Sequence, residues 1–125
     1  MGNPTHPKFL AHEFACKCGK CGRGFEWMRA ETLSKLYKAR DLAGIPFKVS
    51  SAYRCEAHNT ASGGKPNSAH LRGRAVDIDY TTMQEGYTIL KALLDAGFPR
   101  VGINYAKTFI HADDDPTLPA GLFPY

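Results

Sequence analysis

Segments of helical periodicity and segments of strand-like alternation follow one another irregularly along this chain, and this mixture limits the folds open to it. Residues 27–43 carry apolar side chains at helical spacing, and Gly44 provides a stop. A second helix is predicted over 83–96, because Thr82-Met-Gln-Glu85 has the form of a capping box. Strands are predicted over 47–53, 75–79, 100–105 and 108–112. Since there is no regular strand–helix–strand alternation, we expect an α+β fold with a mostly antiparallel sheet flanked by helices.

The two predicted helices are each expected to turn an apolar face toward the core. In the first helix this face consists of Leu33, Leu36, Tyr37 and Ala43. In the second it consists of Met83, Tyr87, Leu90 and Leu94. Residues 1–8 are expected to form a loose arm, residues 59–68 a loop, and the remainder after residue 115 a proline-punctuated tail.

The chain has 125 residues, which is enough for one domain with its own core and too few for two. We therefore expect a single domain over 1–125. Hydrophobic residues make up 43% of the chain and charged residues 22%, which excludes a disordered or fibrous protein. No apolar run approaches the roughly 20 residues that span a bilayer, and no secretory signal is visible. We expect synthesis in the cytoplasm and delivery by another route if the protein acts outside it.

The charge balance is mildly basic, with a formal net charge of +4. It suits an anionic partner such as nucleic acid or an acidic cell wall. The basic residues are spread along the chain, without a run of five or six and without a stripe that alternates with aromatic residues. The pattern therefore does not single out nucleic acid.

Four cysteines form a second notable pattern, three of them in Cys16-Lys-Cys18-Gly-Lys-Cys21. This spacing can chelate a metal ion, with Cys55 or His12 as the fourth ligand. Disulfides are an alternative, although a chain without a signal peptide matures in a reducing compartment. Free buried thiols are the third interpretation, and the sequence leaves all three open.

The most informative stretch is Ser68-Ala-His70-Leu-Arg-Gly73-Arg-Ala-Val-Asp77. His70 and Asp77 are too far apart to meet on one strand, but a turn at Gly73 can fold them onto a common ion. His111 offers a third ligand from a later strand. Two imidazoles and one carboxylate leave a position open on zinc, as in catalytic sites, and zinc lowers the pKa of bound water to about 7. Spacing alone leaves open that this is a surface pair or a satisfied core group.

Further segments extend this pattern along the chain. They are Glu13-Phe-Ala-Cys16-Lys-Cys18, Ser51-Ala-Tyr-Arg54-Cys-Glu-Ala-His58-Asn59, Gly63-Gly64 and Phe109-Ile-His111-Ala-Asp113. Together with the stretch around His70, they resemble the M15 family of zinc peptidases over roughly residues 9–115. That family includes D-alanyl-D-alanine carboxypeptidases, dipeptidases and phage endolysins that cut L-alanyl-D-glutamate bonds. The opening segment resembles that of small phage-associated, M15A-like members. The resemblance implies the fold shared by these DD-peptidases and the Hedgehog signalling domain.

The resemblance also implies roles for individual residues. His70, Asp77 and His111 would hold Zn²⁺. Arg54 would lie near the scissile carbonyl or a substrate carboxylate, where a guanidinium binds negative charge. Ser68 would hydrogen-bond the substrate. Read from the residues alone, Arg54 can instead be an exposed residue that ends a strand, and Ser68 a turn residue.

The general base departs from the family pattern. Many members carry an acid three residues before the last zinc histidine, and here Thr108 occupies that position. We expect Asp113 to serve instead, because residues two apart on a strand share a face and Asp113 would face the site with His111. Alternatively, Asp113 orients a zinc histidine. Asp114 and Asp115 can be a solvated acidic turn.

These features predict a zinc-dependent peptidase that hydrolyses a peptide bond in the stem or cross-link peptides of bacterial peptidoglycan. We expect it to belong to a phage or prophage lysis or tail module, acting after lysis-linked release or as a virion component. The expected partner is the peptidoglycan peptide, and we expect a monomer that binds neither nucleic acid nor a membrane. One alternative is a catalytically inactive zinc-containing binding module of the same fold. Another is a small nucleic-acid binder that uses the cysteines as a zinc ribbon.

Overall fold

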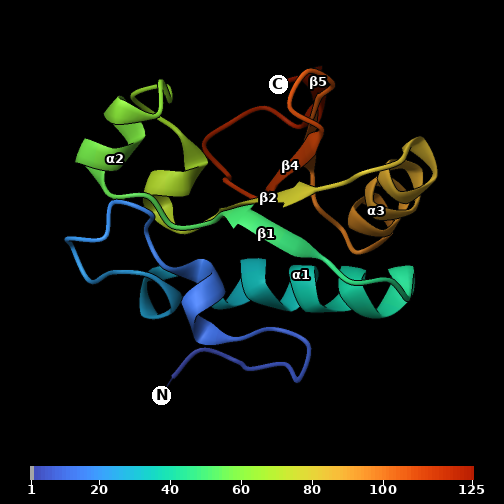
Figure 1. The fold of residues 1–125 in the computed structure, drawn as a ribbon, viewed down its shortest axis with the longest axis horizontal. Helices are drawn as coiled ribbons and strands as arrows, with labels where there is room; N and C mark the ends of the chain where they lie inside the picture. The colour runs from blue at the N-terminus through green and yellow to red at the C-terminus, as the bar shows by residue number, and fades with distance from the viewer. Residues whose placement is uncertain (1) are drawn as a thin grey trace.

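The computed structural model describes residues 2–125 and contains a five-stranded sheet with helices around it (Figure 1). The order across the sheet is β1-β2-β4-β3-β5. β5 pairs in parallel with β3, and the other neighbouring strands pair antiparallel, so the predicted α+β fold is confirmed. The strands are β1 (Lys48–Ser51), β2 (Ala75–Asp79), β3 (Arg100–Asn104), β4 (Phe109–Asp113) and β5 (Gly121–Pro124).

Three α-helices surround these strands. α1 (Ala30–Ala43) packs against α3 (Met83–Asp95), and α3 also contacts β3 and β4. In Figure 1, α1 runs below the strands, α3 lies to their right and the short α2 (Glu56–Ala61) lies to their left. None of the helices described over residues 2–125 is long and apolar enough to cross a membrane.

The two faces of the sheet differ in character because side chains alternate along a strand. One face is apolar and packs into the core through Val76, Ile78, Val101, Ile110 and Ala112. The opposite face carries Asp77, His111 and Asp113, which are polar yet almost fully buried. The pairing register sets Asp77 of β2 directly opposite His111 of β4. The sheet itself therefore assembles the polar cluster.

The predicted apolar face of α3 is wrong except for Leu90, which is half-buried against the core. Met83, Tyr87 and Leu94 are 60%, 66% and 49% exposed, whereas Ile89 and Leu93 are buried. The buried stripe lies roughly a third of a turn around the helix from the predicted one. Both stripes are apolar, and only packing against α1 and the sheet decides which one is covered. The face predicted for the first helix is largely confirmed, with Leu33, Leu36 and Tyr37 buried and Ala43 half-buried.

Several predicted boundaries also shift. The first helix begins at Ala30 instead of residue 27, because Phe25–Trp27 forms the short 3₁₀ helix η2 and the chain is extended at Met28. The last residues of α2 fall inside the segment predicted as a loop. The proline-punctuated tail contains β5. A proline is tolerated there because β5 is an edge strand, and no further strand needs a hydrogen bond from its outer side.

The expectation of a loose N-terminal arm is wrong for the described part of that segment, and Met1 lies outside the described residues. The Asn3 side chain donates hydrogen bonds to the carbonyl oxygens of Phe25 and Met28 at 2.8 and 2.7 Å. The hydroxyl of Tyr37 on α1 donates to the carbonyl oxygen of Pro4 at 2.7 Å. Because these contacts satisfy polar groups of both partners, the segment is held against α1 and the residues that precede it.

Candidate functional site

His70 lies on the short 3₁₀ helix η3 (Ala69–Arg72). The hydroxyl of Ser68 caps this helix by accepting a hydrogen bond from the backbone N–H of His70 at 3.3 Å. Gly73 ends it with a φ of +69°, and a Cβ there would clash with the carbonyl oxygen of Trp27. Both observations require glycine, so the turn predicted at Gly73 is confirmed. It returns the chain into β2 and brings His70 back toward Asp77.

The structure brings the three predicted metal ligands together. Nε2 of His70 lies 3.2 Å from Oδ1 of Asp77. Nδ1 of His111 lies 2.9 Å from the same oxygen. One ligand atom from each residue lies within 4.8 Å of the others, and all three side chains are buried. Two donors bound to zinc at about 2.0–2.1 Å in a tetrahedron are roughly 3.3 Å apart, so these separations suit a zinc ion.

Hydrogen bonds on the far side of each imidazole set its tautomer. Nδ1 of His70 donates to the carbonyl oxygen of Ala52 at 2.6 Å, which leaves the lone pair of Nε2 facing Asp77. Nε2 of His111 donates to Oδ2 of Asp113 at 2.7 Å, which turns Nδ1 toward Asp77. Lone pairs that face a carboxylate repel it unless a cation lies between them. The donor set therefore fits a bound metal ion.

Charge and burial shift the pKa values of the three groups in a consistent way. Complete burial lowers the pKa of His70 and keeps its imidazole neutral, as a ligand must be. Burial alone would raise the pKa of Asp77, but the adjacent His70 and His111 outweigh it and the pKa falls. Burial would lower the pKa of His111, but hydrogen bonds to Asp113 and Asp77 outweigh it and the pKa rises. Without a metal ion, the site therefore favours a proton on His111, and a bound metal ion would replace that proton.

Asp113 lies beside His111 and is only 1% exposed. Its Oδ2 accepts from His111, and Arg100 contacts both carboxylate oxygens at 3.1 and 3.0 Å. Burial would raise the pKa of Asp113, but the bonds from His111 and Arg100 outweigh it and the pKa falls. A carboxylate held in this way is a poor proton acceptor. The contacts favour the orienting role for Asp113 over the role of general base.

Arg54 and Ser68 both line a pocket that Asp77 and His111 also line. The guanidinium of Arg54 lies 3.3 Å from Oδ2 of Asp77, and its Nε donates to the hydroxyl of Ser51 at 3.0 Å. The Arg54 side chain is 12% exposed, so it is neither a free surface residue nor fully enclosed. Ser68 serves as a turn residue through its cap and also lines the pocket, and its hydrogen bond to a substrate stays a prediction.

The other acids and Thr108 do not line the pocket. Asp114 is buried and pairs with Lys35 at 2.7 Å, and Asp115 is buried against Arg72. The interpretation of Asp114 and Asp115 as a solvated acidic turn is therefore wrong. Thr108 is exposed in the turn between β3 and β4, with a φ of +53°.

The pocket has a volume of about 690 Å³, and its wall includes residues that sequence reasoning missed. The Tyr125 ring stacks on His111 with centroids 4.2 Å apart and planes 19° apart. Phe123 of β5 meets His111 edge-on, and Arg100 lies over the Phe123 ring. A Cβ on Gly102 would lie 2.8 Å from Phe123 and 2.9 Å from Tyr125. Glycine at position 102 therefore makes room for an aromatic wall beside His111.

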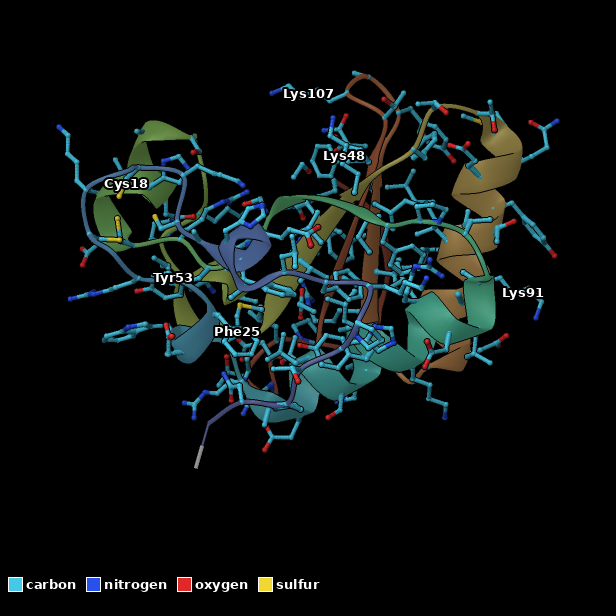
Figure 2. The ribbon with its side chains drawn as sticks, turned by 60° about the horizontal axis from the view of Figure 1, so that its bottom comes forward. Cys18, Phe25, Lys48, Tyr53, Lys91 and Lys107 are labelled. Atoms are coloured by element: carbon cyan, nitrogen blue, oxygen red, sulfur yellow. The ribbon has the colours of Figure 1, made fainter. Side chains whose placement is uncertain are left out.

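Basic side chains dominate the charged lining of this pocket. Arg54, Lys65, Arg100 and Lys107 all line it, whereas its only acids within residues 2–125 are Asp77 and Asp113. Both acids are already engaged with arginines and histidines. Lys107 belongs to the turn between β3 and β4, which lies at an outer edge of the molecule in Figure 2, and its side chain lines the pocket. The pocket therefore presents positive charge to an incoming molecule.

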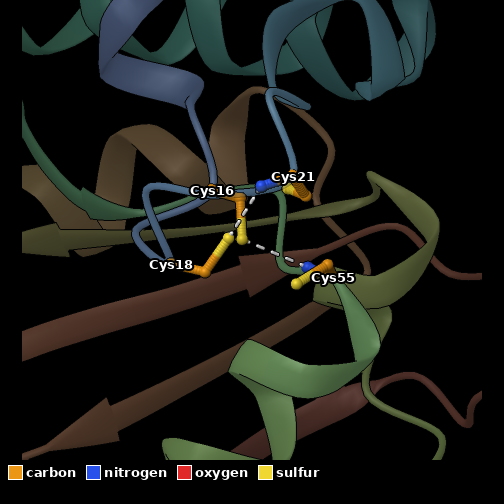
Figure 3. A group of neighbouring side chains, drawn as sticks. All are labelled: Cys16, Cys18, Cys21 and Cys55. Carbon is orange, nitrogen blue, oxygen red and sulfur yellow. Dashed lines mark hydrogen bonds between the residues drawn. The ribbon is translucent and has the colours of Figure 1, made fainter.

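The four cysteines gather away from this pocket. Their sulfur atoms lie within 4.8 Å of one another, and no disulfide joins them within residues 2–125 (Figure 3). Cys55, and not His12, completes the group. Burial raises the pKa of Cys16 to about 11, whereas backbone N–H groups of Lys20 and Cys21 lower the pKa of Cys18 to about 6. Figure 2 places Cys18 at the end of the molecule near Tyr53, opposite Lys91 of α3.

Comparison with known proteins agrees with this architecture. The chain is similar in structure to the L-Ala D-Glu endopeptidase ChiX of Serratia marcescens, with a TM-score of 0.50 and 20% sequence identity. That match covers 70% of this chain and 80% of the other, and it supports the fold. A search of curated proteins found no match. A sequence model of the Peptidase M15 family matches residues 7–113 of this chain. The chain therefore belongs to the Peptidase M15 family.

Proposed function

We propose that this protein is a zinc-dependent peptidase that hydrolyses a peptide bond in the stem or cross-link peptides of bacterial peptidoglycan. The observation that carries the proposal is the convergence of His70, Asp77 and His111 on one point beside a basic pocket. Membership of a peptidase family supports it. When bound there, zinc would supply a Lewis acid that polarises a carbonyl group and lowers the pKa of a water molecule to about 7.

The residues around the metal position have separable tasks in this proposal. His70, Asp77 and His111 would hold the metal ion. Asp113 holds the Nε2 proton of His111 and so keeps Nδ1 free for the metal. Arg54 is fixed by Ser51 and Asp77 and would bind the carbonyl oxygen as negative charge develops on it. Because its partners hold the guanidinium in place, little reorganisation is needed when the substrate arrives.

The charge of the pocket supports the choice of substrate. Peptidoglycan stem peptides carry free carboxylates, and Lys65 and Lys107 at the pocket form no ion pair within residues 2–125. These ammonium groups would attract such carboxylates, and Arg54 and Ser68 would bind them closer to the metal. The aromatic wall of Phe123 and Tyr125 would pack against the apolar part of the peptide.

A second function has an observation in its favour. The only acids that line the pocket within the described chain are Asp77 and Asp113, and both are held in ion pairs. A peptidase needs a group that accepts a proton. If none is available here, the protein would be a zinc-containing cell-wall binding module of the same fold. Such a module would sediment with peptidoglycan without releasing peptides.

Digestion of purified peptidoglycan distinguishes these two functions. The zinc-loaded protein is incubated with peptidoglycan, and mass spectrometry identifies released peptides and new amino termini. We expect released peptides whose termini identify a single type of cleaved bond. The L-Ala–D-Glu bond is the first to examine. His70→Ala should abolish release and lower the zinc content, whereas His12→Ala, an exposed histidine outside the pocket, should change neither. Binding without release by the zinc-loaded wild type would establish the binding module instead.

The biological setting is part of the proposal. We propose that the protein acts in a phage or prophage lysis or tail module, supported by the likeness of Glu13-Phe-Ala-Cys16-Lys-Cys18 to small phage-associated members. It would then reach the wall after lysis-linked release or as a virion component, as a monomer. Light scattering of the purified protein and loss of lysis in a strain that lacks the gene would test these points.

A further inference from the structure

We propose that Cys16, Cys18, Cys21 and Cys55 bind a second zinc ion in a closed structural site, separate from the histidine site. All four sulfur atoms lie within 4.8 Å of one another. Tetrahedral zinc with Zn–S bonds of about 2.3 Å separates its sulfur ligands by roughly 3.8 Å. Four thiolates would fill the coordination sphere and leave no position for water or substrate. The site would therefore stabilise the fold and perform no chemistry.

Backbone N–H groups point at every one of the four sulfur atoms. Cys18 Sγ accepts from the N–H groups of Lys20 and Cys21, both at 3.3 Å. Cys55 N–H donates to Cys16 Sγ at 3.3 Å (Figure 3). The remaining two contacts join Arg23 N to Cys21 Sγ and His58 N to Cys55 Sγ, each at 3.4 Å. Donors at every sulfur stabilise thiolates, which are the form that binds metal.

The charges of the loop match such a centre. Four thiolates and one zinc ion carry a net charge of −2, because four protons leave when the thiols bind the metal. Lys17, Lys20 and Arg23 lie between and beside the cysteines in the chain. Because they are close to the cysteines in the chain, their positive charges would offset part of this negative charge.

The position of the cluster explains what a metal ion would hold. The loop of residues 15–24 has neither helix nor strand, and it lies between η1 (Ala11–Phe14) and η2. Cys55 comes from a distant part of the chain, where its sulfur caps the first turn of α2. A bound ion would tie the loop to α2. It would also steady Arg54, the residue before Cys55, which contacts Asp77 in the pocket.

The wild-type protein itself provides the first test. Protein purified with zinc under reducing conditions should contain two zinc ions per chain by elemental analysis. Cobalt substitution should produce the visible bands and sulfur-to-metal charge transfer of a tetrahedral tetrathiolate, and these should persist in His70→Ala. A mercurial thiol reagent should release one zinc ion from His70→Ala as four thiols react. This measurement does not depend on a cysteine variant that folds.

Paired variants identify the fourth ligand. Cys55→Ser should lose the tetrathiolate spectrum and one zinc ion, whereas His12→Ala should keep both. Two results overturn the proposal: a His70→Ala protein without zinc, or two disulfides found by mass spectrometry in the freshly purified, unreduced protein. Peptide release by the zinc-loaded wild type tests the histidine site separately.

Discussion

Replacement of Asp113 by asparagine separates the two roles available to this carboxylate. The variant keeps the side-chain shape but removes the charge that accepts the His111 N–H at 2.7 Å and pairs with Arg100. If the amide oxygen accepts from His111, the amide NH₂ faces the Arg100 guanidinium, so one of the two contacts is lost. Replacing the partner of a metal-bound histidine typically weakens metal affinity about 10–100-fold, or about 1.4–2.7 kcal/mol. Loss of the ion pair with Arg100 should also lower the free energy of unfolding by about 1–3 kcal/mol. The loss is limited because Arg100 keeps its hydrogen bond to the carbonyl oxygen of Pro119.

The assay measures the zinc dissociation constant by chelator competition and the peptide-release rate at saturating zinc. We expect the dissociation constant of Asp113→Asn to rise about 10–100-fold, with a rate within about tenfold of wild type once zinc is saturating. Asp115→Asn is the matched control, because Asp115 is equally buried in an ion pair with Arg72 but does not line the pocket. An unchanged dissociation constant with a rate lowered about 10²–10⁴-fold would refute this reasoning and make Asp113 the general base.

Three further predictions concern the pocket. Arg54→Ala should lower kcat/KM about 10²–10³-fold without loss of zinc, because charge stabilisation is lost; unchanged kinetics would remove Arg54 from the proposed mechanism. Gly102→Ala should displace β5 and cost about 1–3 kcal/mol of stability, seen as faster hydrogen exchange at residues 121–125; unchanged exchange would show that the aromatic wall tolerates a methyl group. The raised pKa of His111 means that a proton competes with zinc over a wider range of pH than at a free histidine. Zinc affinity should therefore fall as pH falls through that pKa, and affinity that is constant between about pH 5 and 8 would contradict this.

The central strands were predictable because their signals are local. Alternation in β2 and β4 sets Asp77 and His111 on one face, and the glycine at position 73 marks the turn that returns His70 to them. Their grouping was predicted through the family resemblance, and the structure places them together. The roles of these side chains stay predictions until metal binding and activity are measured.

Other features depend on contacts between distant parts of the chain. The strand β5 follows an irregular segment that contains Pro116 and Pro119, and it forms through its pairing with β3. Tyr125 and Arg100 carry no motif, yet they contact His111 and Asp113. The buried face of α3 was misassigned because the helix has two apolar stripes, and tertiary packing selects between them.

Zinc reconstitution of the metal-free protein tests the central claim most directly. The protein is stripped with a chelator and reloaded stepwise, and peptide release from purified peptidoglycan is measured beside bound zinc. A parallel series with His70→Ala gives the zinc held at other sites. The difference between the zinc bound by wild type and by His70→Ala is the zinc at the histidine site. We predict that the rate rises in proportion to this difference. A rate that survives metal removal, or a fully loaded histidine site that releases no peptide, would contradict the account.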